Sequence, residues 1–300
     1  MRPQPCKPGV ERLRFATSAD WGLSVTIGIA AVADTGHIVA VSDQRISFYD
    51  QFPAIEKGMR KLRQITADGR WFLAFAAGDI PPVVPLVRRI TSAVNGLKPH
   101  ERDINDIMTK ASDAYSETRE QTFADGYLRA IGYRTFDMFR KEGLKDLGKD
   151  EHHRHMMELH HFNLDVELII FGHDNQDVAR IFEVRNPGKA SDLTWRRYAA
   201  VGSGRDLALG SIAQRPLPLD WPDIVYRLLG AKFVSEDARD VGKTTTAIVV
   251  APERGGFHEF SENEISNIRA EWKREQAIPT PKAALKVITA HEVLRHVVKD

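Results

Sequence analysis

The stretch from Leu23 to Arg45 constrains the fold more than any other part of the chain, because its pattern is that of two strands joined by a tight turn. Residues from Val25 to Val32 are β-branched or small, and an apolar β-branched run resumes from His37 to Val41. Between them, residues 33–36 have the turn-forming sequence Ala-Asp-Thr-Gly. The stretch ends in Ser-Asp-Gln-Arg. We therefore expect a buried hairpin with polar groups at one end, where a rigid sheet can present chemistry.

The rest of the chain alternates hairpin patterns with pairs of helices. Further strands are expected at residues 61–66, 71–79, 166–172, 178–184, 244–251 and 256–261. Helices are expected at residues 80–94, at 103–139, from 206 onward and at 221–233. This order predicts an α+β fold, a sandwich of two antiparallel sheets between helical layers.

Composition narrows the class of protein. The 300 residues are 42% hydrophobic, which is enough to bury a sizeable core, so we expect one large domain with appendages. A formal net charge of +1 does not favour binding to nucleic acid or to an anionic membrane. The single Cys6 excludes an internal disulfide, and residues 1–22 have no apolar segment typical of a signal peptide. No run is long enough to span a bilayer. We expect a cytoplasmic protein.

Several short motifs follow one another along residues 24–262. They are Ser-Val-Thr-Ile-Gly at 24–28, Asp43 with Arg45 two residues later, the basic run 60–65 with Lys61, the apolar stretch 71–79 ending in Gly-Asp, and Val-Gly-Ser-Gly at 201–204 with Ser203. In order and spacing these motifs resemble the proteasome β-type subunits and the related bacterial proteasome-like ring peptidases, within the N-terminal nucleophile (Ntn) hydrolase superfamily.

This resemblance implies a four-layer αββα sandwich and a nucleophile at Ser24, which self-processing would free as the first residue. Its α-amino group, with a pKa of about 8, would then accept the hydroxyl proton. Lys61, held close to the hydroxyl, would lower the cost of removing that proton, and Asp43 would keep Lys61 charged. The implied activity is hydrolysis of peptide or amide bonds.

The same resemblance assigns supporting roles. Ser203 would relay protons near the new amino terminus, and Arg45 belongs to the motif at the end of the second strand. Backbone N–H groups of a turn near residues 74–76 would form the oxyanion hole. No cofactor is implied. The Gly-Lys-Thr at 242–244 lacks the first glycine of a phosphate-binding loop and precedes a strand pattern, so we do not expect nucleotide binding.

The resemblance also divides the chain and suggests partners. Residues 1–23 would be an N-terminal extension or propeptide, 24–262 the Ntn-hydrolase domain, and 263–300 a C-terminal helical tail. The partners implied are a peptide or protein substrate, further copies of the chain in a homo-oligomeric ring, and an ATP-dependent unfoldase as a candidate. Neither nucleic acid nor a membrane is expected.

Departures from the family sequence leave a second function open. The family cleaves after a glycine, but Leu23 precedes Ser24, and Gly22 lies one residue too early. The acidic and serine residues that support the nucleophile in the family align here with Ala238 and Val241. Because a fold does not imply a function, a non-catalytic, unprocessed ring or scaffold subunit is the alternative.

A charged, histidine-rich insertion at about residues 141–164 leaves a third function open. It holds five of the eleven histidines, namely His152, His153, His155, His160 and His161. Metal binding is one hypothesis for this cluster. The spacing matches no established pair of helical metal ligands and no Cys is near, so a solvated insertion is favoured.

Overall fold

A computed structural model describes residues 27–44, 61–66, 72–78, 80–238, 241–252 and 257–276. The chain divides into two compact units, residues 1–259 and 260–300. None of the helices in the described ranges is long and apolar enough to cross a membrane.

The first unit contains two antiparallel sheets of five strands each. The first sheet has the order β10-β9-β2-β1-β8, with β1 at Gly28–Val32, β2 at Ile38–Asp43, β8 at Tyr198–Val201, β9 at Thr245–Val250 and β10 at Phe257–Glu259. The second sheet has the order β3-β4-β5-β6-β7, with β3 at Leu62–Gln64, β4 at Phe72–Gly78, β5 at Val166–His173, β6 at Ala179–Arg185 and β7 at Lys189–Asp192.

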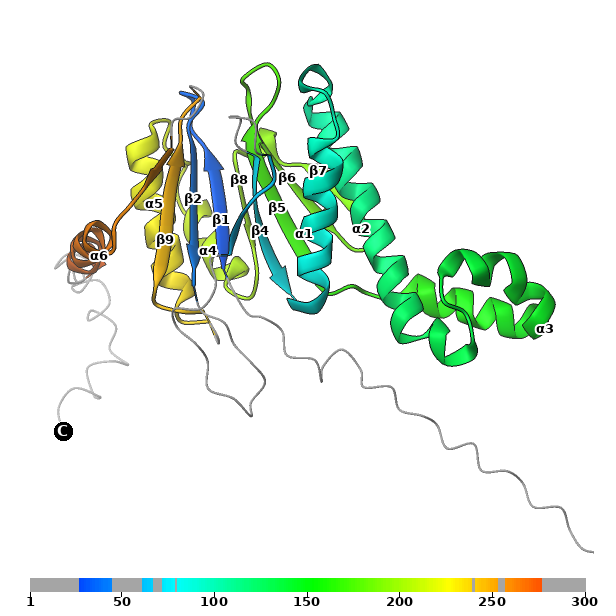
Figure 1. Ribbon diagram of the computed structural model, residues 1–300. Coiled ribbons are helices and arrows are strands. Elements are labelled where there is room, and N and C mark those ends of the chain that lie inside the picture. Colours follow the sequence, from blue (N-terminus) through cyan, green and yellow to red (C-terminus); the bar gives the residue numbers. More distant parts are fainter. Residues whose placement is uncertain are drawn as a thin grey trace, which may run out of the picture. The chain divides into compact units, whose positions relative to one another are not determined.

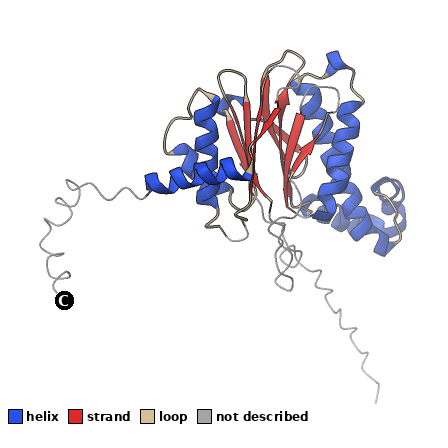
Figure 2. Ribbon diagram, turned by 60° about the vertical axis from the view of Figure 1, so that its left-hand side comes forward, coloured by secondary structure: helices blue, strands red, loops and turns tan. Residues whose placement is uncertain are grey.

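Helices cover the outer face of each sheet. They are α1 at Ile80–Asn95, α2 at Ile104–Gly126, α4 at Arg205–Ala213 and α5 at Trp221–Ser235. Helix α3 at Phe136–His161 lies beyond the end of α2, away from the sheets (Figure 1), and short 3-10 turns occur at Pro99–Glu101, Leu128–Ile131 and Thr194–Arg196. Figure 1 shows α4 and α5 outside the first sheet and α1 and α2 outside the second. Figure 2 shows the two sheets stacked between these helices from a second direction. The predicted four-layer αββα sandwich is therefore confirmed.

Small and β-branched side chains let the two sheets approach closely. One core cluster lies between the sheets and includes Ala30, Ala40, Phe75, Ile169 and Val201, all nearly inaccessible to solvent. A second cluster packs the other face of β4 and β5 against α1 and α2. Because both faces of the strands are buried, apolar residues continue along them rather than alternating strictly.

The strand register gathers several chain segments at one end of the sandwich. Gly28 at the start of β1 pairs with Ser42 and with Val201, so β2 and β8 end where β1 begins. In the second sheet, Leu62 pairs with Phe75, and Gly78 pairs with Val166. We call the end of the sandwich defined by Gly28, Asp43, Lys61, Gly78 and Val201 the mouth.

The region after α2 differs from the prediction of a single helix over residues 103–139. The helix α2 ends at Gly126, and Gly132 takes a left-handed conformation with φ 98°. Thr135 then caps α3, because its hydroxyl accepts a hydrogen bond from the Met138 N–H at 3.2 Å. A helix cannot continue through such a residue, so the long helical pattern splits into α2 and α3, and α3 is itself kinked at Gly148, which has φ 76°.

The second unit contains α6 at Glu262–Gln276. Ser261 and Glu264 form a capping box at its start: the Ser261 N–H donates to the Glu264 carboxylate at 2.7 Å, and the Glu264 N–H donates to the Ser261 hydroxyl at 3.3 Å.

Candidate functional site

Asp43, the last residue of β2, is buried completely at the mouth. Its Oδ1 accepts a hydrogen bond from the backbone N–H of Ile27 at 3.1 Å, and its Oδ2 accepts one from the N–H of Gly242 at 3.0 Å. These donors come from the residue before β1 and from the loop before β9. The carboxylate therefore ties together three segments of the first sheet that are far apart in the sequence.

Lys61, which directly precedes β3, brings a charge from the second sheet to this carboxylate. Its Nζ lies 3.0 Å from Asp43 Oδ1, and only 9% of the residue is exposed. Two unlike charges buried together are tolerated when further hydrogen bonds satisfy them, and the two backbone N–H groups supply those bonds to Asp43. The sequence prediction that Asp43 and Lys61 meet in the fold agrees with this geometry.

Two glycines set the shape of the mouth. A Cβ atom on Gly28 would lie 2.7 Å from the ring of Phe75, so only glycine lets β1 approach β4 this closely. Gly78 has φ 114°, and a Cβ there would lie 1.8 Å from the carbonyl oxygen of Asp165. Gly78 thus turns the chain out of β4 and toward α1.

The position of this turn corrects one prediction. Residues 74–76 lie inside β4, where Ala74 pairs with Ile170 and Arg63 on its two sides, and Ala76 pairs with Leu168. No turn forms at 74–76, because that segment is part of the hydrogen-bonded ladder. The chain reverses two residues later, at Gly78.

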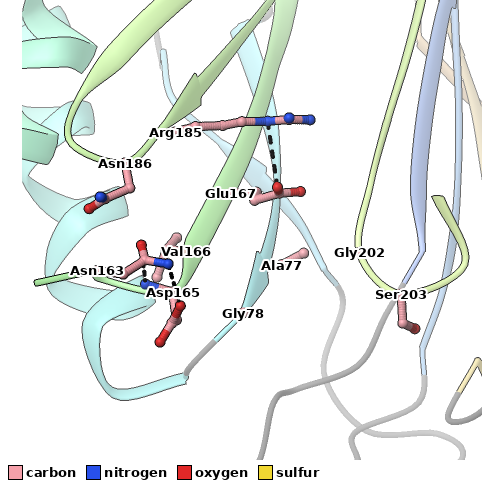
Figure 3. Close-up of a pocket in the computed structure, with 10 residues that line it drawn as sticks. All are labelled: Ala77, Gly78, Asn163, Asp165, Val166, Glu167, Arg185, Asn186, Gly202 and Ser203. Carbon is pink, nitrogen blue, oxygen red and sulfur yellow. Dashed lines mark hydrogen bonds and ion pairs between the residues drawn. The ribbon is translucent and has the colours of Figure 1, made fainter. Parts of the chain in front are cut away.

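Ser203 and Gly78 both line a pocket of about 470 Å³ at the mouth. Ser203 follows β8 in the turn that leads into α4, and its side chain is exposed. Figure 3 shows Gly202 and Ser203 on one side of the pocket and side chains from the ends of β5 and β6 on the other. The other lining residues are Ala77, Asn163, Asp165, Val166, Glu167, Arg185 and Asn186.

The far side of this pocket is polar and charged. Glu167 Oε1 lies 3.5 Å from Nε of Arg185 and 3.7 Å from Nη1 of Arg205. Asp165 accepts a hydrogen bond from the Asn163 side-chain amide at 2.6 Å, and burial raises the pKa of its carboxyl group above the usual value. The pocket can therefore receive a polar group beside the mouth.

The predicted histidine-rich insertion is a helical module with a core of its own. Phe123, Leu128, Phe136, Phe139 and Leu159 pack together where α3 folds back on the end of α2. The helix that carries the histidines, α3, begins at Phe136.

Two of the insertion's histidines belong to this core. His155 is 4% exposed, its Nδ1 lies 3.2 Å from the Tyr127 hydroxyl, and burial lowers its pKa. His152 stacks on the ring of Phe139 with 4.8 Å between centroids. Among the residues with described positions, which include all five histidines, no group of three His, Cys, Asp or Glu side chains could hold a metal ion. The structure gives the metal-binding hypothesis no support.

Two candidate residues, Ser24 and Arg45, lie outside the described residues. The contact that the sequence did not predict is that of Gly242 with Asp43, which are 199 residues apart. The resemblance to the family aligns its supporting residues with Ala238 and Val241, and Val241 directly precedes Gly242. The donor is a backbone N–H group, which every residue except proline has, so the residue type does not reveal the contact. The only sequence signal is a glycine placed just before a predicted strand.

Comparison with known proteins supports the fold. No family model matches the sequence, and no curated protein matches it. Among solved structures, Anbu (ancestral beta-subunit) from Yersinia bercovieri superposes with a TM-score of 0.58 at 14% identity, covering 86% of this chain and 99% of that one. An Anbu (Gly-1) mutant from Hyphomicrobium sp. strain MC1 gives the same values. At this identity the likeness concerns architecture, and the chain has the layered, proteasome-like fold of the ancestral β-subunits.

Proposed function

We propose that this protein is a proteasome-like Ntn hydrolase that cleaves peptide or amide bonds with Ser24 as its nucleophile. Self-processing would remove residues 1–23 and free the Ser24 α-amine, which accepts the hydroxyl proton. Lys61 and Asp43 would provide the electrostatic support for that proton transfer. Two observations support the proposal: the likeness of the fold to the Anbu structures, and the Lys61–Asp43 ion pair at the mouth.

The single observation that carries the proposal is the buried Lys61–Asp43 pair. Its two side chains come from different sheets and meet 3.0 Å apart at the mouth. The donors to Asp43 come from Ile27, Lys61 and Gly242, so the arrangement forms only when both sheets and the loop before β9 are assembled. A site that must hold a lysine in one position needs such support.

The pocket beside the mouth supports a role for Ser203 in the same site. Ser203 and Gly78 line it together with the polar residues at the ends of β5 and β6. A peptide bound there would place its backbone near Ser203 and a side chain against Glu167 and Arg185. In this arrangement Ser203 would relay a proton at the amino terminus, and Arg45 would support the end of β2.

Assembly into a homo-oligomeric ring is part of the proposal, because the solved structures of this fold are described as β-subunits. Helices α1 and α4 present apolar side chains to solvent, with Val84 43% and Leu207 42% exposed. Contacts between copies would cover them. Sedimentation velocity at micromolar concentration should give a species several times the chain mass, and a monomer at all concentrations would contradict this part.

The function is tested by the mass of the purified chain and by hydrolysis of fluorogenic peptides. Wild-type protein should begin at Ser24, and Ser24→Ala should retain residues 1–23 and hydrolyse nothing. Lys61→Ala should reduce turnover by about three orders of magnitude or more, the scale seen when one member of a catalytic set is removed.

A matched control is Lys149→Ala, because Lys149 is an exposed lysine on α3, far from the mouth in the sequence. It should process and hydrolyse like wild type. A wild-type chain that keeps residues 1–23 and hydrolyses no peptide would favour the unprocessed scaffold subunit. Peptide hydrolysis that survives both Ser24→Ala and Lys61→Ala would show that another site is responsible.

A further inference from the structure

Lys232, in the last turn of α5, is a lysine whose side chain is completely buried. Its Nζ donates hydrogen bonds to the carbonyl oxygen of Gly242 at 2.7 Å and to that of Lys243 at 3.2 Å. It also forms an ion pair with Glu236, one helical turn later, whose side chain is 10% exposed. The ammonium group therefore joins the end of α5 to the loop that precedes β9.

Burying an ammonium group is costly unless it is paired and hydrogen-bonded. Here the cost is offset by a carboxylate, by two carbonyl oxygens, and by the partial negative charge at the C-terminal end of α5. Lysine suits this position because its ammonium is a compact charge with three donors that can point in different directions. A chain needing only to fill this space would use an apolar residue.

The loop that Lys232 holds is the one that contacts Asp43. Gly242 accepts a hydrogen bond from Lys232 through its carbonyl oxygen and donates one to Asp43 Oδ2 through its N–H, at 3.0 Å. Two residues later, the Thr244 carbonyl oxygen accepts a hydrogen bond from the N–H of Gln44, the residue after Asp43, at 3.3 Å. The 242–244 segment is thus fixed on one side by α5 and on the other by the end of β2.

We propose that Lys232 is a positioning residue for the site at the mouth. It holds the backbone of residues 242–243 so that the Gly242 N–H stays on Asp43, and Asp43 in turn holds Lys61. Lys232 acts through the backbone of residues 242–243 and through Asp43. The inference rests on the proposed function for its effect on catalysis, while the bracing of the loop can be measured independently.

The physical reason is that removal of the ammonium takes away the hydrogen bonds that Lys232 donates to the carbonyl oxygens of Gly242 and Lys243. The Gly242 and Lys243 carbonyls would then have to reorient toward water, and this rotates the peptide units on both sides. Gly242 has no side chain to resist that rotation. Its N–H would leave Asp43 Oδ2, and the carboxylate could shift relative to Lys61.

The variant Lys232→Met tests this, because methionine keeps much of the length of the side chain without its charge or donors. Hydrogen exchange at the Gly242 amide should accelerate by about tenfold or more. In peptide hydrolysis, kcat should fall by about 10²-fold, the scale of a small misplacement in a catalytic site, with KM little changed. Because a smaller folded fraction would also lower the apparent kcat at unchanged KM, kcat is calculated per folded molecule, with the folded fraction measured by circular dichroism.

Two further variants keep the test decisive if Lys232→Met is poorly stable. Ile90→Ala removes a fully buried side chain from α1, on the other outer layer, and supplies a destabilised protein with an intact loop. Glu236→Gln removes the ion pair but leaves the two carbonyl contacts of Lys232 in place. Both variants should retain slow exchange at Gly242, and Glu236→Gln should lose less kcat than Lys232→Met.

The exchange experiment decides the inference whatever the activity of the protein. Equal exchange at Gly242 in Lys232→Met and Ile90→Ala would overturn it, as would a Glu236→Gln variant as impaired as Lys232→Met. In an active enzyme, an unchanged kcat for Lys232→Met would also overturn it. A wild-type protein without any hydrolysis would instead contradict the proposed function, and fast exchange at Gly242 in Lys232→Met would still support the bracing by Lys232.

Discussion

Two buried aspartates at strand ends, Asp43 and Asp174, occupy opposite ends of the sandwich and have similar partners. Asp43 at the mouth is 0% exposed, and Asp174, just after β5, is 2% exposed. Each accepts hydrogen bonds from two backbone N–H groups and forms an ion pair with a cation. For Asp174 the donors are Gln176 N at 2.9 Å and Val178 N at 3.0 Å, and the cation is Arg180, with its Nε 2.8 Å away.

The two sites differ in how far apart their partners lie along the chain. The partners of Asp174 named above all fall within six residues, so this carboxylate closes the β5–β6 hairpin on itself. The partners of Asp43 are 16, 18 and 199 residues away. A local carboxylate–arginine turn stabilises one hairpin, whereas the Asp43 arrangement forms only when both sheets and the loop before β9 are in place.

The cations differ in a way that matters for chemistry. Arg180 has a guanidinium group, whose rigid planar fork of donors suits a fixed structural contact. Lys61 carries an ammonium group, which can exchange its proton with neighbouring groups. Burial and charge pairing alone therefore do not identify a functional site, and the long-range, lysine-based pair is the better candidate.

The largest expected effect is on hydrolysis. Asp43→Asn preserves the shape of the side chain but removes the charge facing Lys61 and replaces one acceptor oxygen with a donor. We expect self-processing to stop and peptide hydrolysis to fall by about 10³-fold or more, measured with a fluorogenic peptide and by the mass of the chain. Asp174→Asn should process normally. Equal loss of activity in the two variants would erase the functional difference between these carboxylates.

The next largest effect is on stability, and here Asp174 is the residue whose replacement should matter. Asp174→Ala leaves Arg180 and two backbone N–H groups without their carboxylate, and should lower the free energy of unfolding by about 3 kcal/mol, the lower end for breaking a buried pair because Arg180 is partly exposed. Urea unfolding at neutral pH measures this loss.

A surface pair provides the control for Asp174→Ala. The Arg89–Glu117 pair is 3.9 Å apart, and the Glu117 side chain is 69% exposed, so Glu117→Ala should change the free energy of unfolding by less than about 1 kcal/mol. Coincident urea midpoints for Asp174→Ala and Glu117→Ala would show that the Asp174 turn adds little to stability.

The two ends of the sandwich also differ in how much space surrounds a glycine with positive φ, Gly36 at one end and Gly78 at the mouth. Gly36, in the β1–β2 turn, has φ 78°, but a Cβ there would meet its nearest atom only at 3.5 Å. Gly36→Ala should therefore cost about 1 to 2 kcal/mol from left-handed backbone strain alone. Gly78→Ala adds a collision with the Asp165 backbone and should cost at least about 2 kcal/mol more. Thermal unfolding of both variants measures the difference, and equal melting temperatures would mean that the turn at Gly78 can move.

Local sequence patterns predicted the hairpins and helix starts whose hydrogen bonds join residues a few positions apart in the chain. The Ala-Asp-Thr-Gly turn fixed the β1–β2 hairpin, in which Ala33 N bonds to His37 O at 2.8 Å. The hairpin around Asp174 and the start of α1 near Ile80 were likewise predicted, and both depend on residues a few positions apart. The predicted pairing of Asp43 with Lys61 came from the resemblance to a known family, because no local pattern connects the two.

The sequence was insufficient where the fold brings distant backbone groups together. The Gly242 N–H and the carbonyls held by Lys232 are main-chain groups, and their roles depend on the relative positions of α5, β2 and β9. The break in the long helix at Gly132 and Thr135 was missed because the apolar periodicity continues through it. Strand β7 was missed because its four residues are mostly polar and lie at the edge of the sheet.

The smallest expected effect is on pH dependence at the end opposite the mouth. His173 is 4% exposed, and its Nε2 lies 2.7 Å from the Gly36 carbonyl oxygen, joining β5 to the β1–β2 turn. Burial lowers the pKa of His173 below its usual 6.5, and the nearby His37 adds to this, while the hydrogen bond to Gly36 and the carboxylates of Asp177 and Asp174 oppose it. Burial also lowers the pKa of His155.

The direction of the pH effect follows from proton binding. As the pH falls through about 6.5, the unfolded chain takes up a proton at His173 before the folded chain does, so acidification favours unfolding until the lower folded-state pKa is passed. Wild-type protein should thus lose melting temperature between about pH 7 and about pH 5. In His173→Asn, whose amide can still donate to Gly36, that loss should be smaller, and adding His155→Asn should reduce it further. Identical melting curves against pH for wild type and the double variant would show that these two imidazoles do not link folding to protonation.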